Sequence, residues 1–184
     1  MTFVSRLLPR QMAMAFLACA TLILTPLAAK ADLGPASRLV PSAELVGKGR
    51  LTFFGFRIFD AELYAPDGVY ATGKPFALKL TYLRRFSGEA IADRSIDEIR
   101  RQGYGNEAKL SAWSDAMRDI FPDVTPGQSI TGVRDASGRT VFYSGNRRLG
   151  TIADPEFTRR FFAIWLGNNT QDPDLRARLT GIVR

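Results

Sequence analysis

Two polar residues near the end of one predicted strand are the clearest candidates for ligand chemistry in this sequence. Residues 75–85, PFALKLTYLRR, alternate apolar and polar side chains, which predicts a half-buried strand. Tyr82 and Arg84 then lie on the same side of the strand as Leu80. A hydroxyl and a planar guanidinium in such an apolar space could hold a carboxylate or a phenolate. Alternatively, Arg84 ends the strand at solvent and rests its stem against apolar neighbours.

The residue types that most often perform catalysis or bind transition metals are missing from most of the chain. The sequence has no histidine, and Cys19, its only cysteine, lies within an apolar run near the N-terminus. If that run is removed, disulfides, thiol nucleophiles, Cys/His zinc sites and imidazole-dependent triads are excluded. We therefore expect no metal, no cofactor and no catalytic residue of these kinds.

Several carboxylates could be proposed as general acids or bases, but their positions favour a simpler role. Asp93, Asp97, Glu98 and Asp115 fall on the polar faces of two predicted helices. Charged side chains on such faces are normally solvated, so we interpret these four as surface charges.

Residues 1–31 have the features of a secretory signal peptide. Arg6 and Arg10 precede the apolar run MAMAFLACATLILTPLAA, and the segment ends in Ala29-Lys30-Ala31, a small-x-small cleavage pattern. An uncleaved membrane anchor is the main alternative, but Pro26 breaks a run that is already short for a bilayer span. We predict cleavage, a periplasmic location and no stable membrane span afterwards.

Cleavage would leave one domain of ordinary size and modest positive charge. Residues 32–42 contain proline and serine without periodicity and are interpreted as a leader segment, and residues 43–184 as one domain. Residues 1–31 carry three basic residues and no acidic one, so their removal lowers the formal net charge from +7 to +4. The remaining arginines occur singly or in pairs rather than in one stripe, which argues against a nucleic-acid partner. No protein partner is indicated.

The first part of the domain predicts a β-hairpin. Residues 44–54 and 56–65 are rich in aromatic and branched residues and are separated by Gly55. Alternation in the second strand places Arg57 on the core-facing side together with Phe59. The GKGR stretch at residues 47–50 lacks the remaining residues of a phosphate loop, so its glycines are interpreted as part of a strand with a bulge.

The rest of the domain predicts helices and strands in separate blocks. Strand 75–85 is followed by helices over residues 87–102 and 106–121, strands over residues 129–134, 139–144 and 148–152, a helix over residues 155–166 and a last short helix that begins at Pro173. In the helix before Gly167, Phe157, Phe161, Ile164 and Trp165 are expected to close the core over the sheet. This order predicts an α+β fold in which helices cover an antiparallel sheet.

Four stretches, taken together and in this order, resemble the exported bacterial branch of the chalcone isomerase-like family. They are GKGRLTFFGFRIFDAELY, IFPDVTPGQSI, SGNRRLGTI and FTRRFFAIWLGNNTQDPDLR. The resemblance covers about residues 40–184 and implies the family's open-faced β-sandwich, an antiparallel sheet backed by a layer of helices with a cleft between them. Plant members either cyclise chalcones in this cleft or bind fatty acids there without catalysis.

The residues of the plant active site are mostly not matched. An arginine that follows a Gly-x-Gly stretch has Arg50 as its nearest counterpart, although strand parity sets Arg50 opposite Leu51, and Arg57 is the other candidate. The remaining polar positions of the plant enzymes fall at or near Phe59, Ser87, Arg94 and Ile164. The resemblance therefore favours binding over catalysis.

The resulting hypothesis is a periplasmic, non-catalytic protein that binds a hydrophobic anionic molecule such as a fatty acid. Arg57, Arg50, Tyr82 and Arg84 are the predicted ligand-binding residues, in that order. Two alternatives stay open: an intramolecular lyase or isomerase that acts on a chalcone-like or unsaturated substrate, and a structural or interaction protein of the cell envelope.

Overall fold

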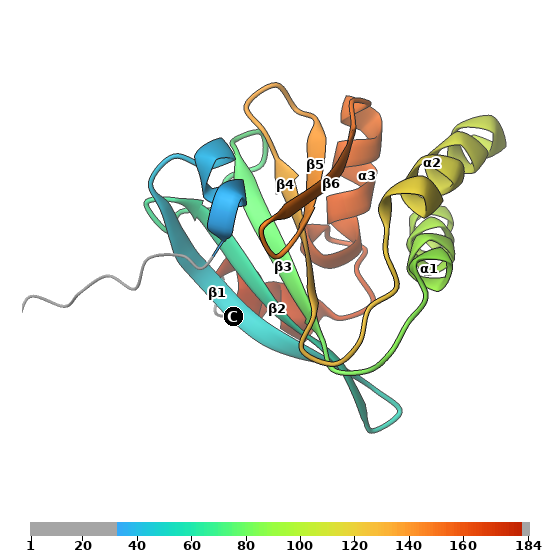
Figure 1. The fold of residues 1–184 in the computed structure, drawn as a ribbon, viewed down its shortest axis with the longest axis horizontal. Helices are drawn as coiled ribbons and strands as arrows, with labels where there is room; N and C mark the ends of the chain where they lie inside the picture. Colours follow the sequence, from blue (N-terminus) through green and yellow to red (C-terminus); the bar gives the residue numbers. More distant parts are fainter. Residues whose placement is uncertain (1–32, 182–184) are drawn as a thin grey trace, which may run out of the picture.

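Six antiparallel strands form one sheet in which each strand pairs with its neighbour in the sequence, in the order β1 to β6 (Figure 1). The computed structural model describes residues 33–181, so the predicted signal peptide lies outside the described residues. The strands are β1 (Ala43–Phe53), β2 (Phe56–Pro66), β3 (Phe76–Tyr82), β4 (Ser129–Arg134), β5 (Thr140–Ser144) and β6 (Arg147–Ile152). The helices are η1 (Gly34–Leu39, a 3-10 helix), α1 (Gly88–Arg101), α2 (Glu107–Ile120), α3 (Pro155–Leu166) and α4 (Pro173–Thr180).

The predicted α+β fold is confirmed, because the strands form an antiparallel sheet and the α-helices are grouped beside it. Local signals fix the helix ends: Ser87, Asn106, Asp154 and Asp172 each cap a helix by accepting a hydrogen bond from a backbone N–H of its first turn. Within residues 33–181, no helix has the length and apolar character that crossing a bilayer requires.

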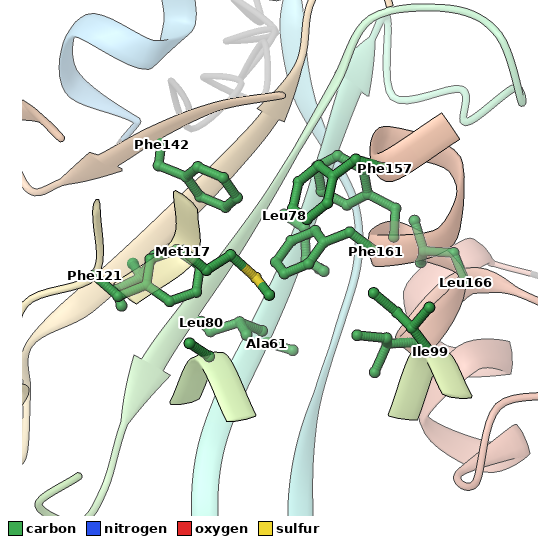
Figure 2. Packing of buried hydrophobic residues seen from close by; sticks show 14 of the residues in the cluster. Ala61, Leu78, Leu80, Ile99, Met117, Phe121, Phe142, Phe157, Phe161 and Leu166 are labelled. Carbon is green, nitrogen blue, oxygen red and sulfur yellow. The ribbon is translucent and has the colours of Figure 1, made fainter. Parts of the chain in front are cut away.

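Aromatic rings pack against one another within the main core, which lies between the sheet and the α-helices (Figure 2). The ring of Phe142 on β5 lies 4.9 Å from that of Phe121 and 5.3 Å from that of Phe161 on α3, both in edge-to-face geometry. Phe161 in turn stacks on Phe157 at 5.2 Å. Aromatic pairs in these geometries each add about 0.5–1.5 kcal/mol beyond their burial, so α3 is held firmly against the sheet.

A smaller core on the opposite face of the sheet is closed by η1. Leu33, Ala36 and Val40 of this segment are buried against the outer sides of β2 to β5, at Tyr64, Ala77, Val133, Val141 and Tyr143. Residues 32–42, expected as a leader without regular structure, thus contain an ordered helix. Three apolar residues in so short a segment do not form a pattern long enough to predict a helix from its periodicity.

Two glycines of β1 allow α4 to pack directly on the strand. A Cβ atom at Gly47 would lie 2.1 Å from the carbonyl oxygen of Arg178, and one at Gly49 would lie 2.7 Å from a methyl group of Leu175. Only glycine allows so close an approach between a strand and a helix. The register between β1 and β2 also shifts between Leu45 and Gly47, which confirms the predicted bulge.

The β1–β2 hairpin turns through two residues with positive φ. Phe54 has φ of 47° and Gly55 has φ of 78°, the signs that a two-residue type I′ turn requires. Glycine adopts this backbone freely, whereas a bulky residue in the left-handed region costs roughly 1–2 kcal/mol. The chain therefore places a phenylalanine where an asparagine would fold at lower cost.

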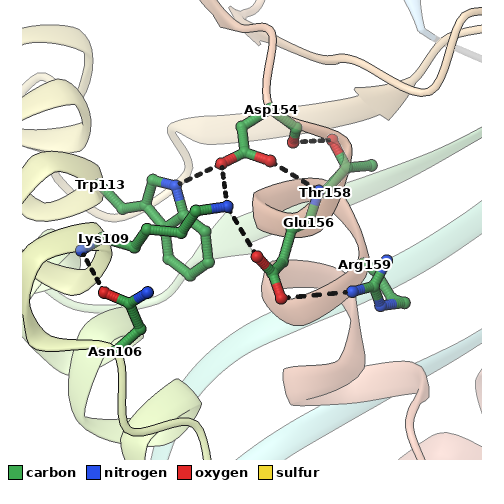
Figure 3. Close-up of polar contacts among 7 residues, drawn as sticks. All are labelled: Asn106, Lys109, Trp113, Asp154, Glu156, Thr158 and Arg159. Atoms are coloured by element: carbon green, nitrogen blue, oxygen red, sulfur yellow. Dashed lines mark hydrogen bonds and ion pairs between the residues drawn. The ribbon is translucent and has the colours of Figure 1, made fainter.

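A polar cluster joins the start of α2 to the start of α3 (Figure 3). The carboxylate of Asp154 accepts hydrogen bonds from the Trp113 indole N–H at 3.1 Å and from the backbone N–H of Glu156 at 2.8 Å. Lys109 donates to Asp154 at 3.3 Å and to Glu156 at 2.7 Å. Burial raises the pKa of Asp154, but these donors outweigh it and hold the pKa below its usual value.

Substitution of Gly47 by alanine is expected to lower the free energy of unfolding by about 1–3 kcal/mol, because the new methyl group overlaps the backbone of α4. Urea denaturation followed by circular dichroism measures this loss. Gly105→Ala is the matched control, since Gly105 has open space around it and no positive φ. Equal stabilities of the two variants would contradict the close contact between β1 and α4.

Substitution of Asp154 by alanine is expected to cost about 0.5–2 kcal/mol at neutral pH through loss of the helix cap. The folded-state pKa of Asp154 lies below its unfolded value, so its contribution is complete above about pH 4 and is lost as the pH falls through the folded pKa. Urea denaturation at pH 7 and at pH 3 should show the variant's deficit shrinking at low pH. Asp97→Ala, which removes an exposed carboxylate on α1, is expected to show little deficit at either pH; a pH-independent deficit for Asp154→Ala would contradict the ionic role.

Candidate functional site

An apolar cavity of about 430 Å³ lies between the sheet and helices α1 and α3. Its floor is formed by side chains from β1 to β5, namely Leu51, Phe53, Ile58, Phe59, Leu78, Leu80, Tyr82, Ile130 and Phe142. Its roof is formed by Ala90, Ile91, Arg94 and Ser95 of α1 and by Phe161, Phe162 and Trp165 of α3. Phe53 and Arg94 are largely exposed although they line the cavity, so the cavity reaches the surface where they lie.

The cavity exists because α1 spans the sheet without packing closely on it. α1 makes its main contacts with α2 and α3 rather than with any strand. The start of α1 is fixed by the segment that follows α2. Phe86 forms a β-bridge with Val124, and the backbone N–H of Gly88 donates to the Asp123 carboxylate at 3.0 Å. A Cβ atom at Gly88 would lie 2.0 Å from the carbonyl oxygen of Phe121, so glycine is needed where the two segments cross.

Tyr82 places a buried hydroxyl group on the floor of the cavity. The residue is 5% exposed, and its ring packs against Phe59 at 6.1 Å and Phe86 at 5.8 Å. Its backbone is fixed at the end of β3 by hydrogen bonds with Gln128 and Gly127. No hydrogen bond of the hydroxyl to a described residue is found, and the hydroxyl is not among the fully buried side-chain atoms that lack a partner, so it faces the open space of the cavity.

Burial raises the pKa of the Tyr82 phenol far above its usual value of about 10. The phenol is therefore neutral at physiological pH and offers its proton as a hydrogen-bond donor. A ligand oxygen in the cavity would satisfy this donor, whereas the free protein leaves it without a protein acceptor.

Arg94 brings a positive charge to the rim of the cavity. Its side chain is 61% exposed and forms an ion pair with Glu98 one turn further along α1. Glu98 is itself buried, and it accepts a second charged hydrogen bond from Arg101 at 2.8 Å. The prediction that Glu98 is a solvated surface charge was wrong, because two arginines from the same helix cover its carboxylate. The guanidinium has five N–H donors, so the ion pair leaves several of them for a ligand.

Ser95 is the third polar residue of the lining, and its hydroxyl proton is already engaged in a hydrogen bond. The Ser95 hydroxyl donates to the backbone carbonyl of Ile91 at 2.8 Å, so it presents only lone pairs to the cavity. Among the described residues that line the cavity there is no carboxylate, imidazole, thiol or amine. The arrangement can donate hydrogen bonds to an oxygen and attract an anion, but it offers no group of suitable pKa to take up a proton.

Arg50 lies on the face of β1 that points away from the cavity, as strand parity predicts. Leu51 lines the cavity, so its neighbour in sequence faces the other way. There Arg50 forms a bidentate ion pair with Asp60 on β2, with Nε–Oδ1 and Nη2–Oδ2 distances of 2.6 and 2.9 Å. This hydrogen bonding lowers the pKa of Asp60. The guanidinium is thus engaged outside the cavity.

Arg57 is exposed and also lies outside the cavity lining, contrary to its predicted place on the core face. The β1–β2 register passes from Leu51 opposite Phe59 to Thr52 opposite Arg57, so Ile58 is an extra residue. This bulge puts Ile58 at the cavity together with Phe59. The predicted alternation is therefore broken between Arg57 and Phe59.

Arg84 follows the end of β3 and is exposed, which agrees with the alternative that it ends the strand at solvent. Its guanidinium carbon lies 4.6 Å from the ring centroid of Phe56. Of the four predicted ligand-binding residues, Tyr82 alone lines the cavity in the structure. That any of the four holds a ligand stays a prediction.

Arg94 was not predicted as a ligand-binding residue, although its sequence position contains a signal. Ala90, Ile91, Arg94 and Ser95 have the spacing of one helix face and lie beside the fully apolar stripe of α1. The aromatic helix α3 serves two purposes. Phe157 and Ile164 are buried in the core as expected, whereas Trp165 also forms part of the cavity roof.

Comparison with known proteins agrees with this architecture. The fold is similar to that of a solved fatty-acid binding protein from Arabidopsis thaliana, with a TM-score of 0.58 and 12% sequence identity over 76% of this chain and 87% of that chain. No match to a curated protein sequence was found. The profile of the chalcone isomerase-like family matches residues 42–181, which is most of the chain. This protein therefore belongs to the chalcone isomerase-like family.

Proposed function

We propose that this protein binds an amphipathic anion of the fatty-acid class in the cavity between the sheet and α1, and does so in the periplasm without converting it. The observation that carries the proposal is the Tyr82 hydroxyl, a donor that faces a mainly apolar cavity and has no partner among the described residues. A ligand that supplies a charged acceptor to this donor gains binding free energy.

The size and composition of the cavity suit an acyl chain. Its volume of about 430 Å³ lies within the range of about 300–1,000 Å³ found for small-molecule sites. Each methylene group transferred from water into such a lining contributes about 0.8 kcal/mol. The similar fold of a protein described as fatty-acid binding supports the same ligand class here.

The polar residues of the lining suit a carboxylate head group. The neutral Tyr82 phenol donates a hydrogen bond, and Arg94 provides a positive charge at the rim. The absence of a carboxylate, imidazole or amine from the described lining supports binding rather than acid–base catalysis. The predicted export signal supports a periplasmic site of action.

Replacement of Tyr82 by phenylalanine is expected to weaken the binding of laurate and palmitate. A hydrogen bond to a charged group contributes about 1.5–3 kcal/mol, so the Kd should rise about ten- to hundredfold. Isothermal titration calorimetry with the exported protein measures this change. Tyr143→Phe is the matched control, because Tyr143 is equally buried but belongs to the core on the other face of the sheet.

Failure of the parent protein to bind either acid saturably, or equal affinities of parent and Tyr82→Phe, would overturn the proposal. Incubation with a chalcone, followed by chromatography, tests the catalytic alternative. We expect the chalcone to be recovered unchanged beyond its uncatalysed rate, and accelerated conversion would instead favour an intramolecular lyase.

Replacement of Arg94 by glutamine is expected to weaken the binding of palmitate about two- to fivefold, the size expected for a partly solvated charge pair. Binding of hexadecanol, which has the same chain but no charge, should not change. Arg101 still covers Glu98 in this variant, so the helix remains intact. Arg57→Gln is the control for the earlier assignment: a larger loss with Arg57→Gln than with Arg94→Gln would place the head group outside the cavity rim.

A further inference from the structure

The tip of the β1–β2 hairpin exposes three phenylalanines side by side. Phe53, Phe54 and Phe56 are 53%, 85% and 59% exposed, and they are the largest exposed apolar side chains among the described residues. The pairing of β2 with β3 begins only at Phe59, so the tip extends past the neighbouring strand. Figure 1 shows this hairpin projecting beyond the rest of the sheet. Among the described residues, Arg84 lies over the Phe56 ring, but the rings still remain largely exposed.

The exposed phenylalanines at the tip are not required for the hairpin to fold. Phe54 occupies a left-handed backbone position that phenylalanine adopts at a cost, and its ring points into solvent. The rings of Phe53 and Phe54 pack against each other at a centroid distance of 4.4 Å. A contiguous exposed apolar group of this kind indicates an interaction surface.

Arginines lie beside the aromatic tip or close to it in the sequence. Arg57 follows the tip on β2, and Arg84 and Arg85 lie in the segment after β3, where Arg84 reaches over the Phe56 ring. Neither Arg84 nor Arg85 forms an ion pair with a described residue. The nearest carboxylate in the sequence, Asp60, is bound by Arg50. The tip is thus an apolar group beside a segment with two arginines, Arg84 and Arg85, that form no ion pair with a described residue.

This combination fits the interface of an anionic lipid bilayer better than it fits a folded protein surface. Aromatic side chains favour the boundary between head groups and acyl chains, and arginines near it are attracted to anionic lipids. The tip is a narrow projection rather than a groove or a flat face, so it can enter a head-group layer but offers little area to a protein partner.

The tip is continuous with the mouth of the cavity. Phe53 is exposed at the tip and also lines the cavity, and Leu51 and Ile58 extend the lining inward from it. A bilayer that accepts the rings of Phe54 and Phe56 would therefore lie next to the opening through which an acyl chain enters.

We propose that the hairpin tip, defined by Phe53, Phe54 and Phe56, docks on anionic lipid bilayers and holds the cavity mouth at the membrane surface. The role of docking in ligand exchange rests on the proposed function, but docking itself does not require a ligand. Vesicle binding can therefore fail or succeed independently of fatty-acid binding.

Sedimentation with vesicles of phosphatidylglycerol and phosphatidylcholine tests the docking. The exported protein should bind these vesicles, bind pure phosphatidylcholine vesicles weakly, and dissociate from the former at high salt. Phe54→Ser is expected to lower the vesicle partition coefficient about tenfold, because one buried ring is lost. Val69→Ser, which removes an exposed apolar residue from a different loop, should leave it unchanged.

Two further variants separate the contributions of charge and insertion. Replacement of Arg84 and Arg85 by glutamine should reduce binding to anionic vesicles and its dependence on salt. Phe54→Trp should keep binding, and its added fluorescence should shift to the blue when vesicles are present. Phe54 and Phe56 do not line the cavity, so Phe54→Ser should keep the palmitate affinity of the parent protein.

Three results would overturn the proposal. They are absence of binding to phosphatidylglycerol vesicles, equal vesicle binding by Phe54→Ser and the parent protein, and a Phe54→Trp emission spectrum that vesicles do not change. Concentration-dependent self-association that Phe54→Ser abolishes would likewise overturn it, by assigning the tip to a second copy of this chain.

Discussion

How closely each helix approaches the sheet decides where this protein has a cavity. Gly47 and Gly49 let α4 lie against β1, and Gly150 lets Ile120 of α2 lie against β6, where a Cβ atom would stand 2.7 Å away. None of the strand glycines among residues 33–181 lies against α1. α4 and α2 therefore lie close to the two edge strands and α3 contacts β4 and β5 between them, whereas α1 stands off the sheet. The space beneath α1 follows from this difference, because α1 is held mainly by α2 and α3 rather than by a strand.

The sequence predicts the features that depend on local spacing, and the structure confirms them. Helix caps, the buried side of β3 and the aromatic face of α3 each follow from side-chain periodicity. The position of Arg57 could not be predicted, because a bulge of one residue at Ile58 reverses the alternation. Arg94 could not be assigned to the cavity for another reason. The sequence indicates which face of the helix carries Arg94, but the distance between α1 and the sheet is set by the tertiary contacts of other helices.

The environment of Tyr82 determines what its phenol can offer to a ligand. Desolvation that raises the phenol pKa makes the phenolate scarce, so the residue that could act as a base is held in its neutral form. The apolar lining around the phenol also strengthens a hydrogen bond that the phenol donates. Desolvation thus keeps the phenol neutral and favours its role as a donor to a ligand oxygen. The Ile164 side chain lies in the core and adds no polar group to the cavity.

Unequal strand lengths connect the cavity to the exposed hairpin tip. β1 and β2 each have 11 residues, whereas β3 has 7, so at about 3.3 Å per residue the first two strands extend past both their neighbour and the helical layer. Apolar side chains on the extended part have no helix to cover them. Nearer the sheet, Leu51 and Ile58 face the cavity, and further out Phe54 and Phe56 face solvent. The apolar surface is therefore continuous from the cavity to the tip, and a partner for the tip must be one that accepts both exposed aromatic rings and the arginines beside them.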